Sequence, residues 1–173
     1  MKDKITQKLL NLFDRVEKKH ALSDSERAVF YSSWIYSAVH LMTSLNRDVD
    51  FNFICSRLKV SPEKIRQVLE FLKNNNLVIE EKGLLKNGLG NNHLEKKSPF
   101  IFKHHTNWRI KAIEKIEDLS DEKLMYSVNL SLSKGDFMKL REEMVQFIQK
   151  FLKTVHASPA EDIAQLNLDF FWV

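Results

Sequence analysis

The chain has 173 residues, of which 43% are apolar and 29% charged, a composition typical of a globular protein with a real core. The single cysteine excludes an intramolecular disulfide and a cysteine-based zinc finger, and no apolar run approaches the ~18 residues of a membrane span. The first ten residues lack a hydrophobic region long enough for a signal peptide. We therefore expect a cytoplasmic protein without membrane contact.

Charge is distributed unevenly along the chain, whose formal net charge is +4. Residues 1–115 contain 21 basic and 13 acidic residues, whereas residues 116–173 contain 6 basic and 10 acidic ones. This asymmetry favours a polyanionic partner for the first part and not for the second. Two unrelated solvated surfaces would give the same counts, so both interpretations stay open.

Two helices are predicted before residue 46. Apolar residues at helical spacing predict the first over residues 4–19. Ser23 and Glu26 match a capping box, which begins a long helix that reaches about Leu45. This second helix is expected to be deeply packed because it carries an apolar face: Val29, Phe30, Trp34, Ala38, Leu41, Met42 and Leu45.

A short helix, a turn, a longer helix and a hairpin are predicted next. The short helix covers residues 51–58, and Ser61 caps a helix over residues 62–74 that begins with proline. The hairpin has strands over 77–81 and 84–86. This order is typical of a winged helix-turn-helix, in which the second helix enters the major groove of DNA. The inward positions of that helix are Ile65, Val68, Leu69 and Leu72.

The outward face of the helix over residues 62–74 carries the candidate DNA contacts. Arginine and lysine can pair with guanine, and asparagine and glutamine with adenine. Acidic residues oppose them, since residues 51–88 contain 7 basic and 4 acidic residues, and a lone module would bind DNA weakly. The predicted DNA-binding residues, one of them in the hairpin turn, are Lys64, Arg66, Gln67, Lys73, Asn74 and Lys82.

The C-terminal part has a different character. An irregular segment over residues 87–103 precedes a helix that runs from about residue 106 to Ile116, with Ile110 and Ile113 also inward. Alternating apolar and polar residues then predict half-buried strands over 125–133 and 163–173, separated by a helix. Ser133 is the expected cap of that helix, and the inward strand positions are Tyr126, Val128, Leu130, Leu132, Leu166, Leu168, Phe170 and Trp172.

The predicted strand–helix–strand module could contact a second copy of the chain, a third strand of its own chain or a small molecule. Two strands alone are marginally stable, and their exposed edges invite pairing with a second copy of the chain. A third strand, from residues 100–102, would instead cover the edge within one chain. The polar face of the strands is either solvated or a surface for an unidentified small-molecule effector.

No catalytic site, metal site or cofactor is predicted. Ser61 and Lys64 have the spacing of a serine–lysine nucleophile, but Ser61 stands where a helix cap is needed. The three histidines between residues 93 and 105 lack carboxylates at ligand spacing. Cys55 lies among apolar residues of the short helix, where a small core residue is the more frequent role.

Five segments of the chain occur in a characteristic order and spacing: 30–39, 53–83, 107–109, 126–132 and 165–170. Together they resemble a family of uncharacterised bacterial regulator-like proteins. Members of that family combine a Cro-type N-terminal helix-turn-helix with a conserved C-terminal domain of unknown function. The resemblance covers residues 28–171 and implies a regulator without assigned catalytic residues.

The chain departs from this family at its N-terminus. Only residues 1–22 stand in the place of that family's N-terminal module, with room for one helix, so we expect no Cro-type helix-turn-helix here. If the family binds DNA mainly through that module, this chain does not bind DNA.

The sequence thus predicts an α+β fold, mainly α, with a winged helix-turn-helix followed by a small strand–helix–strand module. The expected divisions are 1–22, an N-terminal helix; 23–103, the winged helix-turn-helix with an extended wing loop; and 104–173, a helix plus the β-α-β module. The predicted function is that of a non-enzymatic transcription-regulator-like protein that binds double-stranded DNA and forms a homodimer or senses an effector. The alternative is an adaptor that binds another protein and no DNA.

Overall fold

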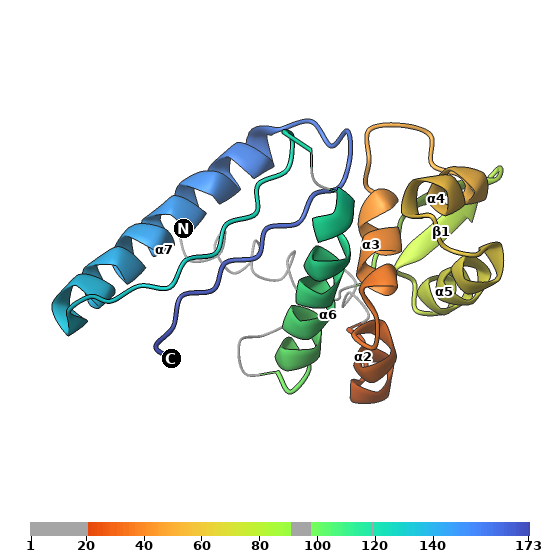
Figure 1. Ribbon diagram of the computed structural model, residues 1–173. Helices are drawn as coiled ribbons and strands as arrows, with labels where there is room; N and C mark the ends of the chain where they lie inside the picture. The colour runs from red at the N-terminus through yellow and green to blue at the C-terminus, as the bar shows by residue number, and fades with distance from the viewer. Residues whose placement is uncertain (1–20, 91–97, 119) are drawn as a thin grey trace, which may run out of the picture.

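The computed structural model describes residues 21–90, 98–118 and 120–173 and is mainly helical, with one two-stranded antiparallel sheet (Figure 1). The expected mainly α class with a small β component is therefore confirmed. The helix predicted over residues 4–19 lies outside the described residues, as does the middle of the predicted wing loop.

Two short helices replace the long helix predicted from Ser23 to about residue 45. The capping box is confirmed, because the Ser23 Oγ accepts a hydrogen bond from the Glu26 N–H at 3.3 Å. The prediction of a single helix is wrong because Ser33 starts a new one by accepting from the Ile35 N–H at 3.4 Å, and such hydroxyls compete with helical hydrogen bonds. The two helices are α2 (Asp24–Phe30) and α3 (Trp34–Met42).

The predicted short helix, turn and longer helix are confirmed. Asp50 caps the short helix, α4, by accepting a hydrogen bond from the Phe53 N–H at 2.7 Å. Ser61 caps the longer helix, α5, by accepting from the Lys64 N–H at 3.3 Å, and a proline follows at the first helical position. A proline there sacrifices no helical hydrogen bond. The bounds are Phe51–Leu58 for α4 and Pro62–Asn74 for α5, whose buried residues are Ile65, Val68, Leu69 and Leu72.

The predicted hairpin is also confirmed. Strand β1 (Val78–Glu81) pairs antiparallel with β2 (Leu84–Asn87). Lys82 and Gly83 form the turn with φ values of 52° and 80°, and positive φ at both central residues matches the right-handed twist of a hairpin. The Leu85 N–H also donates to the carbonyl of Val49 at 2.7 Å, which ties the hairpin to the segment before α4.

One hydrophobic core joins α2, α3, α4, α5 and the hairpin. Rings pack edge to face within it, with centroids 5.0 Å apart for Phe30 and Tyr31 and 5.3 Å apart for Tyr36 and Phe71. This core fixes α5 on its inner face and leaves its outer face in solvent. Its largest fully buried side chains include Phe30, Met42, Ile54, Ile65, Leu72 and Leu77.

Helix α6 (Ile101–Glu114) begins earlier than predicted, and a 3-10 turn, η1 (Ile116–Asp118), follows it. Its contacts with the first helices are polar and aromatic. The Asn107 Nδ2 donates to the carbonyl of Tyr31, directly after α2, at 2.9 Å, and the Trp108 ring lies 6.2 Å from that of the first residue of α3. The predicted inward face is wrong because these contacts turn the opposite side to solvent, leaving Ile110, Ile113 and Ile116 between 50% and 64% exposed.

The predicted β-α-β module is a helix flanked by two extended segments. Helix α7 (Lys134–Ala157) is capped as predicted, with the Asp136 N–H donating to the Ser133 Oγ at 3.0 Å. Residues 120–132 and 160–173 run alongside it (Figure 1), but neither is a strand in the described structure. The strand predictions are wrong because alternating apolar and polar residues indicate only an extended backbone. A hydrogen-bonded strand also needs the edge of a partner strand about 4.8 Å away. Residues 101–102 of the proposed third strand begin α6 instead.

Polar contacts attach the segment after α7 to the rest of the molecule. The guanidinium of Arg57, on α4, donates to the Asp162 carboxylate at 2.6 and 3.0 Å. Arg109, on α6, pairs with Asp169 in the same way, with Nε 3.0 Å from Oδ1. Two side chains at the start of the segment, Ala160 and Ile163, also pack on the core.

Candidate nucleic-acid interface

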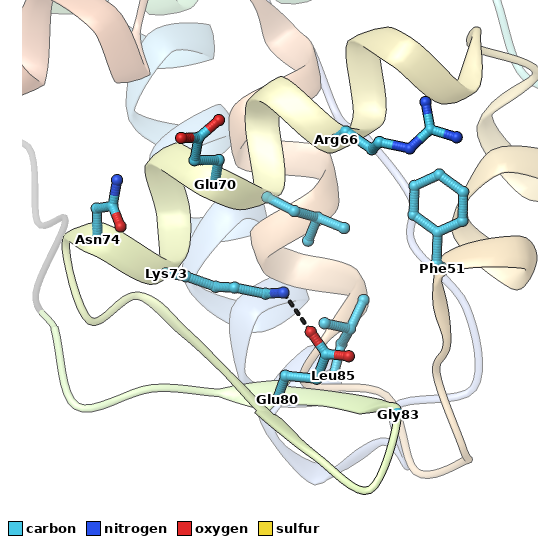
Figure 2. A pocket seen from close by; sticks show the side chains of 9 residues that line it. Phe51, Arg66, Glu70, Lys73, Asn74, Glu80, Gly83 and Leu85 are labelled. Atoms are coloured by element: carbon cyan, nitrogen blue, oxygen red, sulfur yellow. Dashed lines mark hydrogen bonds and ion pairs between the residues drawn. The ribbon is translucent and has the colours of Figure 1, made fainter.

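A groove of about 620 Å³ lies between α5 and the hairpin (Figure 2). The inner face of α5 is held by the core, so the outer face and the hairpin together form a stable concave surface. Three of the six residues predicted to bind DNA line it, namely Arg66, Lys73 and Asn74. The full lining comprises Phe51, Arg66, Leu69, Glu70, Lys73, Asn74, Glu80, Gly83 and Leu85.

Arg66 is exposed on α5 and held by two contacts. Its Nη1 lies 3.2 Å from a carboxylate oxygen of Glu63, one turn earlier. Its guanidinium carbon also lies 5.4 Å from the centre of the Phe51 ring, within the range of a cation–π contact. The two partners orient the guanidinium toward the end of the groove formed by α4 (Figure 2).

Lys73 crosses the groove to the hairpin. Its ammonium group forms an ion pair with Glu80 on β1, as the dashed line in Figure 2 shows. Asn74, the last residue of α5, is exposed beside it. The sequence pattern contained both charged residues, but their pairing across the turn after α5 depended on how the hairpin folds back.

The other predicted residues lie outside the groove lining. The Lys64 ammonium sits 5.9 Å from the centre of the Tyr36 ring, so it extends toward α3. Gln67 is exposed on α5, and Lys82 is exposed in the hairpin turn. The structure therefore does not gather all six residues into one cluster.

Glutamate side chains pair with three of the basic residues on α5 and the hairpin. Glu81 pairs with Lys86 at 2.6 Å on the hairpin, in addition to the pairs of Arg66 and Lys73. All three pairs are at least one third exposed, and exposed ion pairs contribute only about 0–1 kcal/mol. A phosphate can therefore replace a carboxylate partner at small cost, although the resting surface is of mixed charge.

The rejected catalytic and metal sites gain no support from the geometry. Ser61 caps α5, and His104 and His105 are neighbours on α6 with ring centres 5.8 Å apart. Burial raises the pKa of the Cys55 thiol, which disfavours a reactive thiolate. His93 lies outside the described residues. Among those that are described, no group of three or more His, Cys, Asp or Glu side chains is placed to hold a metal ion.

No helix in the described ranges combines the length and apolar character needed to cross a membrane. Even α7, with 24 residues, carries charged side chains throughout.

Comparison with known proteins yields few relatives. No curated protein matches the chain. A solved structure of wild-type ZitR from Lactococcus lactis is similar at 15% sequence identity, with 88% of this chain and 96% of ZitR covered and a TM-score of 0.24. A TM-score this low carries no argument about fold or function.

A family match extends over nearly the whole chain. The family described as Domain of unknown function (DUF4423) matches residues 14–173. The match includes the groove beside α5 and the whole of α7 with its flanking segments, so these are features within the family's domain. It also confirms the resemblance to a domain of unknown function. The chain belongs to the DUF4423 family.

Proposed function

We propose that residues 34–87 form a winged helix-turn-helix that binds double-stranded DNA. Helix α5 would enter the major groove, and β1–β2 would be the wing beside it. The observation that carries this proposal is the two-sided environment of α5. Its inner residues are buried in the core, while Arg66, Gln67 and Asn74 are exposed on its outer face. The neighbouring hairpin carries Lys82 in its turn.

The exposed residues include the types that read base edges. Arginine pairs with guanine, and glutamine and asparagine pair with adenine. Lys73 and Lys82 would contact phosphates and position the helix, since phosphate contacts dominate affinity and base contacts supply specificity. The exposed Glu63 and Glu80 partners would be exchanged for DNA groups on binding.

The protein would act as a non-enzymatic cytoplasmic regulator of the transcription-regulator type. Residues 120–173 would serve dimerisation or effector sensing. The net charge of the two parts supports this division of roles. It is +8 for residues 1–115 and −4 for residues 116–173.

A second function is favoured by the mixed charge of the groove. Both cations of its lining, Arg66 and Lys73, already pair with glutamates in the free protein, which weakens the field that would attract a polyanion. An adaptor that binds another protein through the groove, and no DNA, is the alternative.

A gel-shift titration against genomic fragments, at stated salt concentrations, tests the DNA proposal. Lys73→Ala should weaken binding to every sequence and lower the salt slope by about one. Arg66→Ala should cost about 1–3 kcal/mol and relax the base preference at one position. Glu80→Gln should strengthen binding, because it removes a negative charge and releases Lys73.

Lys103→Ala, at an exposed lysine on α6, is the matched control and should leave binding unchanged. Absence of salt-dependent binding to any duplex at low ionic strength would reject the DNA proposal and favour the adaptor.

A further inference from the structure

The C-terminal module, defined as residues 120–173, exposes most of its large apolar side chains. Phe137 is the one large hydrophobic residue buried there within the described structure, by stacking on Phe170 and Trp172 with ring centres 4.3 and 4.4 Å away. The exposed ones lie on both extended segments and along α7: Leu124, Met125, Tyr126, Val128, Leu130, Met138, Phe147, Phe151, Leu152, Val155, Leu166, Leu168, Phe171, Trp172 and Val173.

This apolar surface is too large for a monomer to leave in water. Its five exposed aromatic residues, at 38–80% exposure, present roughly 500–600 Å² if each can bury ~150–250 Å². The ten aliphatic side chains on the same segments and helix add to that area. Stable interfaces bury about 800 Å² per partner, whereas single patches on monomers rarely exceed a few hundred Å². The module therefore has the area of a complete interface.

The backbone of the two extended segments points to the same conclusion. Their alternating sequences fit a pleated sheet, yet neither forms a ladder within the part of the chain that the structure describes. Neither Lys nor Arg nor Pro occurs in residues 124–133 or 163–173, so the residues that normally block edge pairing are missing. The one charge in these stretches, Asp169, is engaged by Arg109.

Charge favours a second copy as the occupant of this surface. Helix α7 carries five basic and three acidic residues, whereas the two extended segments together carry one basic and five acidic ones. Two of those five, Asp162 and Asp169, pair with arginines of the same chain, so three remain for contacts with a second copy. The module thus contains both signs that a self-complementary contact needs. A two-fold dimer uses the same patch on both subunits, which fits a surface that is both apolar and complementary to itself.

We propose that two copies of this chain associate through residues 120–173, with α7 and the extended segments of one copy packed against those of the other. The proposal rests on the dimerisation role suggested for the C-terminal module and replaces effector sensing as its main task. It places the two α5 helices in one particle, so that two weak DNA contacts would add.

Light scattering of the full chain, without DNA, tests the association separately from DNA binding. The expected mass is twice 20.4 kDa at high concentration and falls toward 20.4 kDa on dilution. Phe147→Glu, at a side chain 53% exposed on α7, should raise the dimer dissociation constant on the order of 30-fold or more. Leu89→Glu, at a leucine 70% exposed beyond the hairpin, is the matched control and should leave it unchanged.

A wild-type mass near 20.4 kDa at all concentrations would overturn the proposal, as would a dimer that Phe147→Glu leaves intact. If Phe147→Glu does not fold, hydrogen exchange of the wild type decides. Amides of residues 124–132 and 164–172 should be protected above the dissociation midpoint and exchange faster below it. Concentration-dependent protection elsewhere would place the interface elsewhere and reject the proposal.

Discussion

The residues from Leu22 to Leu85 and those from 120 to 173 bury their apolar side chains to very different extents. In the described structure, every buried hydrophobic residue except Phe137 belongs to the first region. Both regions show clear apolar periodicity in the sequence, so periodicity alone does not explain the difference. The first region folds its apolar faces onto one another, whereas the second presents a helix and two extended segments with few partners (Figure 1).

This contrast is the basis for the proposal that the first region supplies stability and the second supplies association. The first region has a core, capped helices and a closed hairpin turn, and it holds α5 and the groove in place. The second is attached by contacts that include the Arg57–Asp162 and Arg109–Asp169 ion pairs, and most of its apolar surface is exposed. A second copy on residues 120–173 would leave the groove beside α5 open to its own ligand.

The largest expected effect is a cavity in the core of the first region. Leu72→Ala should lower the free energy of unfolding by ~2–5 kcal/mol, because Leu72 is fully buried. Leu124→Ala, at a side chain 93% exposed, should change it by less than about 0.5 kcal/mol. Urea denaturation at the lowest practical protein concentration, where association contributes least, measures both. Equal losses of unfolding free energy in the two variants would contradict the difference in burial between the regions.

A smaller effect is expected from removing one helix cap in each region. Ser61→Ala should cost about 1 kcal/mol of global stability, since α5 unfolds with the core. Ser133→Ala removes the same kind of cap from α7, where the expected result is faster amide exchange in the first turn and little change in the urea midpoint. A shift of the midpoint as large as that of Ser61→Ala would show that α7 unfolds with the core.

The smallest effect concerns the attachment between the regions. Hydrogen bonds from Arg57 hold the pKa of Asp162 below its ordinary value, so the folded state favours the ionised carboxylate. This contribution to stability is present above the unfolded pKa of about 3.9 and is lost as pH falls through the lowered folded pKa. Asp162→Asn should therefore lower the melting temperature slightly at neutral pH and not in acid.

Asp121→Asn serves as the control, because Asp121 is an exposed carboxylate with no ion pair in the described structure. Thermal melts of both variants and the wild type across the acid range make the comparison. A difference between Asp162→Asn and wild type that persists at the lowest pH would show that Arg57 acts through packing instead of charge.

The sequence predicted the elements that are determined by neighbouring residues. The caps at Ser23, Ser61 and Ser133 and the Lys82-Gly83 turn are local, because each depends on hydrogen bonds or dihedral angles within a few positions. Their elements were found with nearly correct bounds. The prediction of one long helix before residue 46 is wrong because the Ser33 cap, a second local signal, starts a new helix within a continuous apolar stripe.

The candidate site could be predicted only in part. Helix α5 and its outward residue types follow from the 3.6-residue period. The pairing of Lys73 with Glu80 and the contact of Arg66 with Phe51 require the hairpin and α4 to return to α5. Residue spacing gives no distance between elements, so the sequence could not predict that the cations of the groove pair with glutamates.

What the sequence determined by itself was therefore local: which segments are helical, where they begin, which turn closes the hairpin, and that residues 125–133 and 163–173 are extended. What only the tertiary structure decided was which apolar faces find partners. The inward face of α5 is buried, while isoleucines of α6 and alternating residues of the extended segments stay in solvent. The reason is physical, because periodicity fixes the direction of a side chain, whereas burial depends on a complementary surface from another part of the chain or from another chain.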